Sequence, residues 1–150
     1  MKRLSFTLLC TLFLFSALAQ KGLDGRWEGT ITHNGKRADQ KFQLVIEVNG
    51  AEVKGRTYLF LEDKSVIEMD FKGRYYYDQS IYFEELEIPE DLEVDLSLIP
   101  PFLRKFQAIY NRSIFGSTLE GYWQEVTSDI LGKKRLRGRI FLKKITGNKA

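Results

Sequence analysis

The chain of 150 residues has almost none of the residue types that build thiol and imidazole sites, because it contains one cysteine and one histidine. Cys10 lies in the first apolar run, and removal of that run leaves no disulfide, no thiolate ligand and no cysteine nucleophile. His33 stands beside Asn34-Gly35, a turn, so we expect it at the surface. One imidazole cannot supply a structural zinc site, and no motif places a serine nucleophile beside it. The sequence therefore predicts no metal, no cofactor and no catalytic residue.

Long apolar runs are also scarce, and the one over residues 4–15 is too short to span a bilayer well. Lys2 and Arg3 precede this run, and Ala17-Leu18-Ala19 follows it. A basic start, a short apolar core and an Ala-x-Ala site are typical of a secretory signal peptide. We predict a signal peptide over residues 1–19, cleaved near Ala19, and one exported domain over residues 20–150, periplasmic or extracellular. An uncleaved anchor is the alternative, and we expect no transmembrane segment in the mature chain.

An excess of one charge is missing as well. Removing Lys2 and Arg3 from the 23 basic residues leaves 21 against 20 acidic ones. Nucleic-acid binding depends on a surplus of positive charge, so a nearly neutral exported domain is not expected to bind nucleic acid. About 130 residues suit a single domain with its own core.

Apolar residues do not recur at helical spacing after the leader, whereas they alternate with polar residues in many places. The clearest alternation, Phe42 to Val48, runs directly into Asn49-Gly50, a strong hairpin signal. Further turns are expected at residues 62–64 and 78–79. Other strands are expected at residues 23–33, 53–62, 67–74, 80–88, 105–114, 118–126 and 136–145. About eight short strands joined mostly by tight turns predict an all-β, antiparallel, up-and-down barrel.

The predicted first strand carries Gly25-Arg26-Trp27-Glu28-Gly29, and Gly121-Tyr122-Trp123 repeats part of this spacing. The first motif resembles the opening of calycin-type barrels, the lipocalins and their smaller relatives. The whole chain resembles small secreted lipocalin-like proteins of Bacteroidetes type, whose function is uncharacterised. The resemblance implies that Trp27 plugs one barrel end, with Arg137 or Arg139 packed over it. The chain departs from lipocalins in lacking a mature cysteine and in ending soon after its last strand.

Large side chains on the inward positions give two alternatives: they fill the core, or some line a cavity for a small apolar or amphipathic ligand. The candidate lining residues are Trp27, Phe42, Leu44, Leu59, Met69, Phe71, Phe83 and Trp123. In this ligand-binding hypothesis, residues 89–102, with three prolines, form a lid.

The rival hypothesis is a packed barrel that meets a protein partner through its outer surface, including Tyr58, Phe60, Tyr75 to Tyr77 and Tyr122. An open interior of about 300 Å³ or more would favour a ligand. A packed interior with exposed aromatic side chains would favour a partner.

Charged residues gather in two segments. The acidic one is interpreted as a solvated rim and contains Glu84, Glu85, Glu87, Glu90, Asp91, Glu93 and Asp95. The face of its strand is ambiguous, because Glu85 shares the parity of Ile81 and Phe83. The basic segment is interpreted as a solvated barrel wall, with a patch for anionic lipid or polysaccharide as the alternative. It contains Lys133, Lys134, Arg135, Arg137, Arg139, Lys143 and Lys144.

Overall fold

The computed structural model describes residues 22–33, 39–87, 103–126 and 135–146. The predicted signal peptide and the predicted lid over residues 89–102 lie outside these ranges. The described residues form eight strands: β1 (Gly25–Ile31), β2 (Gln40–Asn49), β3 (Glu52–Phe60), β4 (Val66–Tyr75), β5 (Ser80–Glu85), β6 (Leu103–Ser113), β7 (Gly116–Val126) and β8 (Arg137–Lys144).

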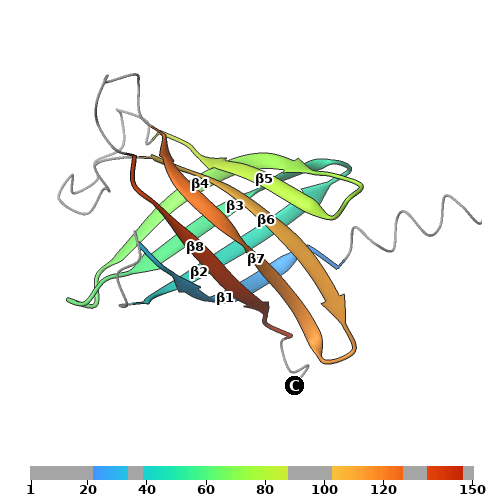
Figure 1. The fold of residues 1–150 in the computed structure, drawn as a ribbon, viewed down its shortest axis with the longest axis horizontal. Helices are drawn as coiled ribbons and strands as arrows, with labels where there is room; N and C mark the ends of the chain where they lie inside the picture. The colour runs from blue at the N-terminus through green and yellow to red at the C-terminus, as the bar shows by residue number, and fades with distance from the viewer. Residues whose placement is uncertain (1–21, 34–38, 88–102, 127–134, 147–150) are drawn as a thin grey trace, which may run out of the picture.

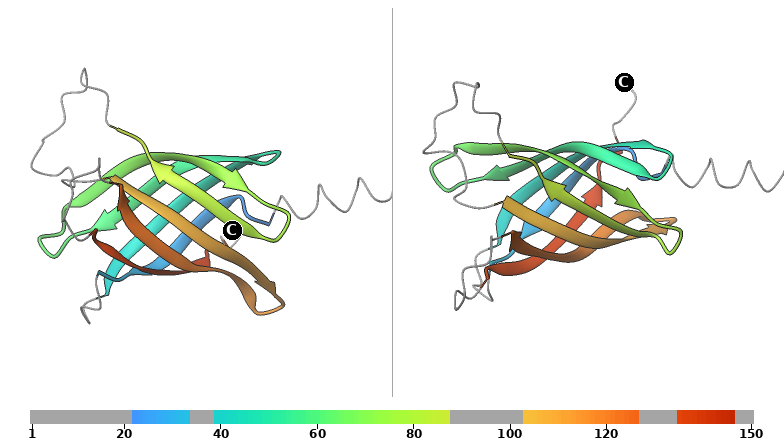
Figure 2. Two further views of the ribbon diagram at one scale, coloured as in Figure 1. Left: turned by 45° about the horizontal axis from the view of Figure 1, so that its top comes forward. Right: turned by 90° about the horizontal axis from the view of Figure 1, so that it is seen from above.

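Each strand pairs antiparallel with the next, and β8 pairs with β1, so the sheet closes into an up-and-down barrel (Figure 1). The predicted all-β meander barrel is confirmed. Figure 2 shows β3, β4 and β5 on one wall and β6, β7 and β8 on the opposite wall. Closure pairs the edges that an open sheet would leave exposed. No helix among the described residues is long and apolar enough to cross a membrane.

Strand alternation places one set of side chains inside the barrel, as expected for a period of two residues. In β4, for example, Ile67, Met69 and Phe71 are buried, while Glu68 and Asp70 are exposed. The buried apolar core includes Leu23, Trp27, Ile31, Phe42, Leu44, Ile46, Val53, Leu59, Ile67, Met69, Phe71, Ile81, Phe83, Phe106, Ala108, Tyr110, Leu119, Trp123, Ile140 and Leu142.

The structure has turns at the three predicted places, and the first turn is shifted by one residue. Gly50 has a positive φ of 62°, whereas Asn49 is the last residue of β2 and pairs with Glu52. The two-residue loop is therefore Gly50-Ala51 rather than Asn49-Gly50, and one position in it needs the left-handed conformation that glycine adopts without strain. Lys64 and Gln79 also have positive φ, at 70° and 66°, in the two other predicted turns.

The two ends of the barrel differ in their connections. The hairpins β2–β3, β4–β5 and β6–β7 lie at the end where β1 begins, on the right in Figure 1. We call this the Trp27 end. At the opposite end, which we call the Glu85 end, β5 stops at Glu85 and β6 begins at Leu103. The connections β1–β2, β5–β6 and β7–β8 belong to this second end and are longer than the hairpins of the first.

Candidate functional site

Trp27 closes its end of the barrel from inside. The side chain is fully buried, its indole N–H donates to the carbonyl of Leu23 over 3.0 Å, and its ring meets Tyr110 edge to face at 5.9 Å. The ammonium group of Lys144 lies 5.8 Å from the indole and donates to the carbonyl of Gly22 over 2.6 Å. Burial lowers the pKa of Lys144, and nearby Asp24 partly offsets that effect.

The basic cover over Trp27 is therefore Lys144, at the end of β8, and not Arg137 or Arg139 as the resemblance implied. Arg137 and Arg139 lie at the beginning of β8, which belongs to the Glu85 end. The register shows why, because Trp27 pairs with Lys144 across β1 and β8. The guanidinium carbon of Arg139 lies instead 5.4 Å from the centre of the Tyr122 ring, on the outer face of the barrel.

Four phenylalanine rings fill the middle of the barrel. Phe83 and Phe106 stack with ring centres 4.5 Å apart, Phe106 stacks on Phe42 at 5.8 Å, and Phe71 contacts Phe83 at 4.7 Å. The rings come from β2, β4, β5 and β6, so they join opposite walls. Offset and stacked aromatic pairs each add about 0.5–1.5 kcal/mol beyond the burial of their area.

A buried ion pair lies at the Glu85 end of the barrel, against the rings of Phe42 and Phe106. The Arg104 guanidinium donates through Nη2 to Oε1 of Glu85 over 2.6 Å and through Nε to Oε2 over 2.9 Å. The backbone N–H of Arg104 also donates to Glu85, over 3.0 Å. Thr57, two strands away on β3, donates its hydroxyl to Oε1 of Glu85 over 2.9 Å. The three residues thus form one hydrogen-bonded cluster inside the barrel.

This cluster is isolated from bulk water. The side chains of Arg104 and Glu85 are 1% and 0% exposed, and Thr57 is fully buried. Arg104 packs over the rings of Phe42 and Phe106, with its central carbon 5.5 and 5.8 Å from their centres. Glu125, the neighbour of Arg104 on β7, is also buried and accepts from the backbone N–H of Leu136 over 3.0 Å. The Glu85 end is therefore polar inside, whereas the middle of the barrel is aromatic.

All the candidate lining residues point into the barrel, and none is more than 5% exposed. Their side chains belong to the buried core cluster, and the same inward positions would form the wall of an interior pocket. At the Glu85 end, the indole N–H of Trp123 donates to the carbonyl of Thr32 over 2.8 Å. His33, expected at a surface turn, instead lies half-buried with its ring 4.9 Å from that indole.

Two interior residues differ from the sequence-based interpretation. Glu85, assigned to a solvated acidic rim, is inside the barrel, because it follows the inward parity of Ile81 and Phe83. Arg104 was not anticipated, since the strand was expected to begin at Lys105 whereas β6 begins at Leu103. The alternation of the strand could have indicated its inward position, because Arg104 lies two residues before Phe106 and four before Ala108, and both of these side chains point inward.

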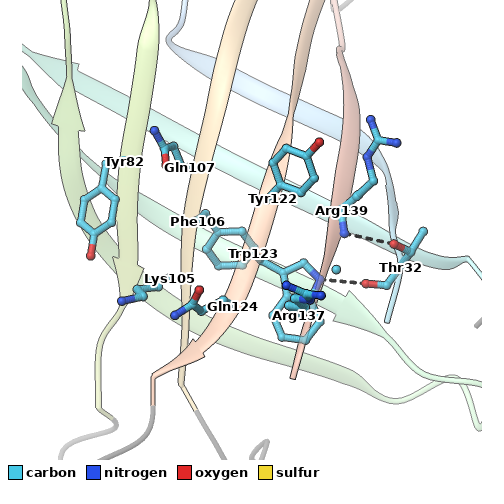
Figure 3. Close-up of a pocket in the computed structure, with 11 residues that line it drawn as sticks. Thr32, Tyr82, Lys105, Phe106, Gln107, Tyr122, Trp123, Gln124, Arg137 and Arg139 are labelled. Carbon is cyan, nitrogen blue, oxygen red and sulfur yellow. Dashed lines mark hydrogen bonds between the residues drawn. The ribbon is translucent and has the colours of Figure 1, made fainter. Parts of the chain in front are cut away.

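A groove of about 680 Å³ crosses the outer face of β5, β6, β7 and β8 (Figure 3). We call it the outer groove. Two rows of outward side chains border it, each set by the strand register. One row contains Tyr82, Gln107, Tyr122 and Arg139. The other row contains Lys105, Gln124 and Arg137. Phe106, Trp123 and Gly138 occupy the row between them.

The floor of the outer groove is mostly backbone, because the side chains of Phe106 and Trp123 turn into the core. Gly138 has no side chain, and a Cβ there would overlap the Thr32 carbonyl oxygen and the indole nitrogen of Trp123. At the rim, the Tyr82 hydroxyl donates to Glu84. Burial, followed by the hydrogen bond and negative charge of Glu84, raises the pKa of Tyr82 to about 12.

Neither the scan of family models nor the search of curated proteins finds a match for this chain. Solved structures with a similar fold do exist. A low-affinity mutant of shwanavidin superimposes with a TM-score of 0.54 at 12% identity, covering 83% of this chain and 97% of that one. Rhizavidin, solved as a complex with biotin, superimposes with a TM-score of 0.52 at 11% identity, covering 85% and 97%. The chain therefore shares the closed eight-stranded barrel fold of these two structures.

Proposed function

We propose that this protein is an exported, non-enzymatic barrel that binds a small amphipathic molecule inside its Glu85 end. The buried cluster of Glu85, Arg104 and Thr57 is the observation that carries the proposal. Ligand pockets are mostly apolar, with a few polar groups that orient the ligand, and this cluster lies directly over Phe42 and Phe106.

The energetics of the cluster support a role beyond packing. Removing two charges from water costs several kcal/mol per ion, and well-packed apolar residues of similar volume are often as stable as a buried pair. The remaining inward positions of the barrel are largely apolar, so an ion pair here is a specific chemical feature. Arg104 offers donors to a carboxylate or carbonyl, while Thr57 and Glu85 offer a hydroxyl and acceptor oxygens.

The position of the cluster agrees with entry from the Glu85 end. Trp27, Leu23 and Lys144 close the other end, and its strands are joined by tight hairpins. Longer connections belong to the Glu85 end, and connecting segments commonly carry binding residues on a rigid scaffold. The biotin complex of rhizavidin, a barrel of the same fold, adds support from a neighbour.

Native mass spectrometry of the mature protein, purified from its own envelope, tests this function. We expect a bound molecule of low mass that is released on denaturation and identified by extraction. The purified protein is then titrated with biotin and with laurate while amide signals are followed by nuclear magnetic resonance. Shifts at Thr57, Glu85 and Arg104 are the expected result.

Thr57→Val supplies the sharpest variant, because it keeps the shape of the side chain and removes the hydroxyl that donates to Glu85. We expect it to weaken binding about tenfold, whereas Thr118→Val should not, because Thr118 contacts Glu120 on the surface. A bare mass together with no interior shift on addition of either probe would contradict the proposal.

A packed barrel that meets a protein partner is the second candidate function. Three exposed side chains favour it: Tyr77, Ile114 and Phe115 lie in the hairpins of the Trp27 end and are 93–106% exposed. Aromatic residues are enriched at protein interfaces. Crosslinking in intact cells from a photoreactive residue at position 115 should then give one discrete adduct. A matched residue at position 64, in a polar turn at the opposite end, should give none.

Export is proposed from the leader sequence, whose basic start, apolar run and Ala17-x-Ala19 are described above. Fractionation of the native cells, followed by N-terminal sequencing, tests it. A mature N-terminus at Gln20 in the envelope or the medium is the expected result. An intact leader in the cytoplasm would contradict export without affecting the binding proposal.

A further inference from the structure

We propose that the outer groove is a second binding site, separate from the barrel interior, and that its ligand is an acidic sugar. The ligand class is a hydroxylated ring that carries a carboxylate or sulfate group. The groove measures about 680 Å³, which falls within the usual range for small-molecule sites.

The charge of the groove is positive and localised. Lys105, Arg137 and Arg139 line it, and none of the described lining residues is acidic. Glu84 is an acidic neighbour at the rim, beside Lys105 and Tyr82 and on the strand of the groove farthest from the two arginines. Arg137 and Arg139 lie on either side of Gly138 on one strand, and Figure 3 shows their side chains on two sides of the groove. Arginine presents its donors in a planar fork that matches a carboxylate or sulfate. This part of the groove therefore suits the anionic group.

The rest of the lining suits sugar hydroxyls and ring faces. Gln107 and Gln124 belong to the two bordering rows, and each amide both donates and accepts. Tyr122, 64% exposed, and half-buried Tyr82 offer ring faces against which the C–H groups of a sugar can pack. Hydroxyl-bonding amides between aromatic rings and cations match an acidic sugar better than a bare anion.

A lipid surface fits the same groove poorly. The outward side chains that line it are polar or amphipathic, and the purely apolar Phe106 turns inward at 1% exposure. The exposed apolar residues Ile109, Phe141 and Val126 lie in neighbouring rows, outside the lining of the groove. Membrane-surface binding needs an exposed apolar face that enters the interface as well as positive charge. A second copy of this chain is likewise not favoured by charge, since two such grooves would bring like charges together.

The experiment uses tetragalacturonate, its fully methyl-esterified neutral counterpart, and the mature protein. Isothermal titration calorimetry should show binding of the acid but not of the ester. Salt should weaken that binding between 50 and 500 mM, as expected for exposed charges. The double variant Arg137→Gln with Arg139→Gln should bind about tenfold or more weakly. Circular dichroism and the thermal midpoint check that this variant remains folded.

The matched control removes the same charge elsewhere on the barrel. Lys54→Gln with Lys72→Gln alters two outward lysines that pair across β3 and β4, away from the groove. It should bind tetragalacturonate as the wild type does.

Three outcomes would overturn the proposal. The first is absence of binding by the wild type. The second is equal loss in both double variants, which would mean attraction by net charge alone. The third is binding to vesicles containing phosphatidylglycerol that tetragalacturonate does not displace.

Discussion

Glu85 and Arg104 are single residues with opposite charges on adjacent strands of a barrel interior that is otherwise largely apolar. The charge of each is compensated by the other, because both side chains are buried, and Thr57 donates one further hydrogen bond to Glu85. A buried pair behaves asymmetrically under mutation. Removing one partner leaves an uncompensated charge in the core, whereas replacing both with apolar residues removes the desolvation cost together with the attraction.

Arg104→Met should therefore lower the free energy of unfolding by about 3–5 kcal/mol, because Glu85 is left buried without its cation. Glu85→Leu combined with Arg104→Met should recover most or all of that loss. Urea denaturation of the single and double variants measures both values.

The control for this pair is Arg56→Gln. Arg56 contacts Asp70 over 2.8 Å on the surface, where an exposed pair contributes about 0–1 kcal/mol. A double variant as unstable as Arg104→Met alone would show that packing, and not charge, sets the loss.

Tyr82 should titrate late. Its pKa is raised to about 12, by burial first and by Glu84 second, so the phenol keeps its proton in the folded state above pH 10. The unfolded chain loses that proton near pH 10. The protonated Tyr82 phenol therefore contributes in full to the free energy of unfolding below about pH 10, and this contribution disappears as the pH rises toward 12.

Ultraviolet titration at the wavelength of tyrosinate checks this, with Tyr82→Phe identifying the late component. Glu84→Gln should move that component to lower pH. A late component that persists in Tyr82→Phe would assign the raised pKa to another tyrosine.

The interior residues illustrate what sequence parity can and cannot provide. Phe42, Met69, Phe71 and Phe83 were predictable, because each lies in an alternating strand beside a turn signal. Arg104 carries the same parity signal, but a charged residue directly before a strand resembles a loop residue. Its inward position depends on a partner, Glu85, that alternation on one strand cannot identify.

At the scale of elements, β1 and β8 together build the closure of the Trp27 end. Trp27 belongs to β1, Lys144 ends β8, and Leu23 precedes β1 with full burial. The resemblance implied that Trp27 would plug an end, but the identity of the basic residue depends on the register between the first and last strands. That register joins residues 117 positions apart, from Trp27 to Lys144, and no local pattern specifies it.

Trp27→Ala should lower the free energy of unfolding by about 3–5 kcal/mol, because it leaves a cavity beside Tyr110 and an unpaired carbonyl at Leu23. Trp27→Phe should cost less, since most of the volume remains. Lys144→Met tests the cover separately and should cost less than Trp27→Ala, because the methionine retains the packing of the lysine stem. Thermal and urea unfolding distinguish the three variants. Equal losses in Trp27→Ala and Trp27→Phe would contradict a role based on volume.

At the scale of the whole molecule, the closed ladder leaves β1 and β8 paired on both sides. Their amides should therefore exchange hydrogen as slowly as those of β3, which an open sheet of the same strands would not show. Hydrogen exchange followed by nuclear magnetic resonance measures this strand by strand. Fast exchange in β1 and β8 alone would contradict closure in solution.

The described ends of the barrel also lie close together. The side chain of Lys144 reaches the carbonyl of Gly22, and the backbone N–H of Ile145 donates to Arg26 over 2.8 Å. The order in which the eight strands are synthesised is therefore separable from the way they pair. A circularly permuted chain that begins at Ala51, ends at Gly50 and links residue 145 to residue 22 by a short flexible segment should form the same barrel. The new termini of such a chain would lie at the opened loop between β2 and β3. The protein could then be attached to a surface through either terminus without interrupting the two candidate binding sites.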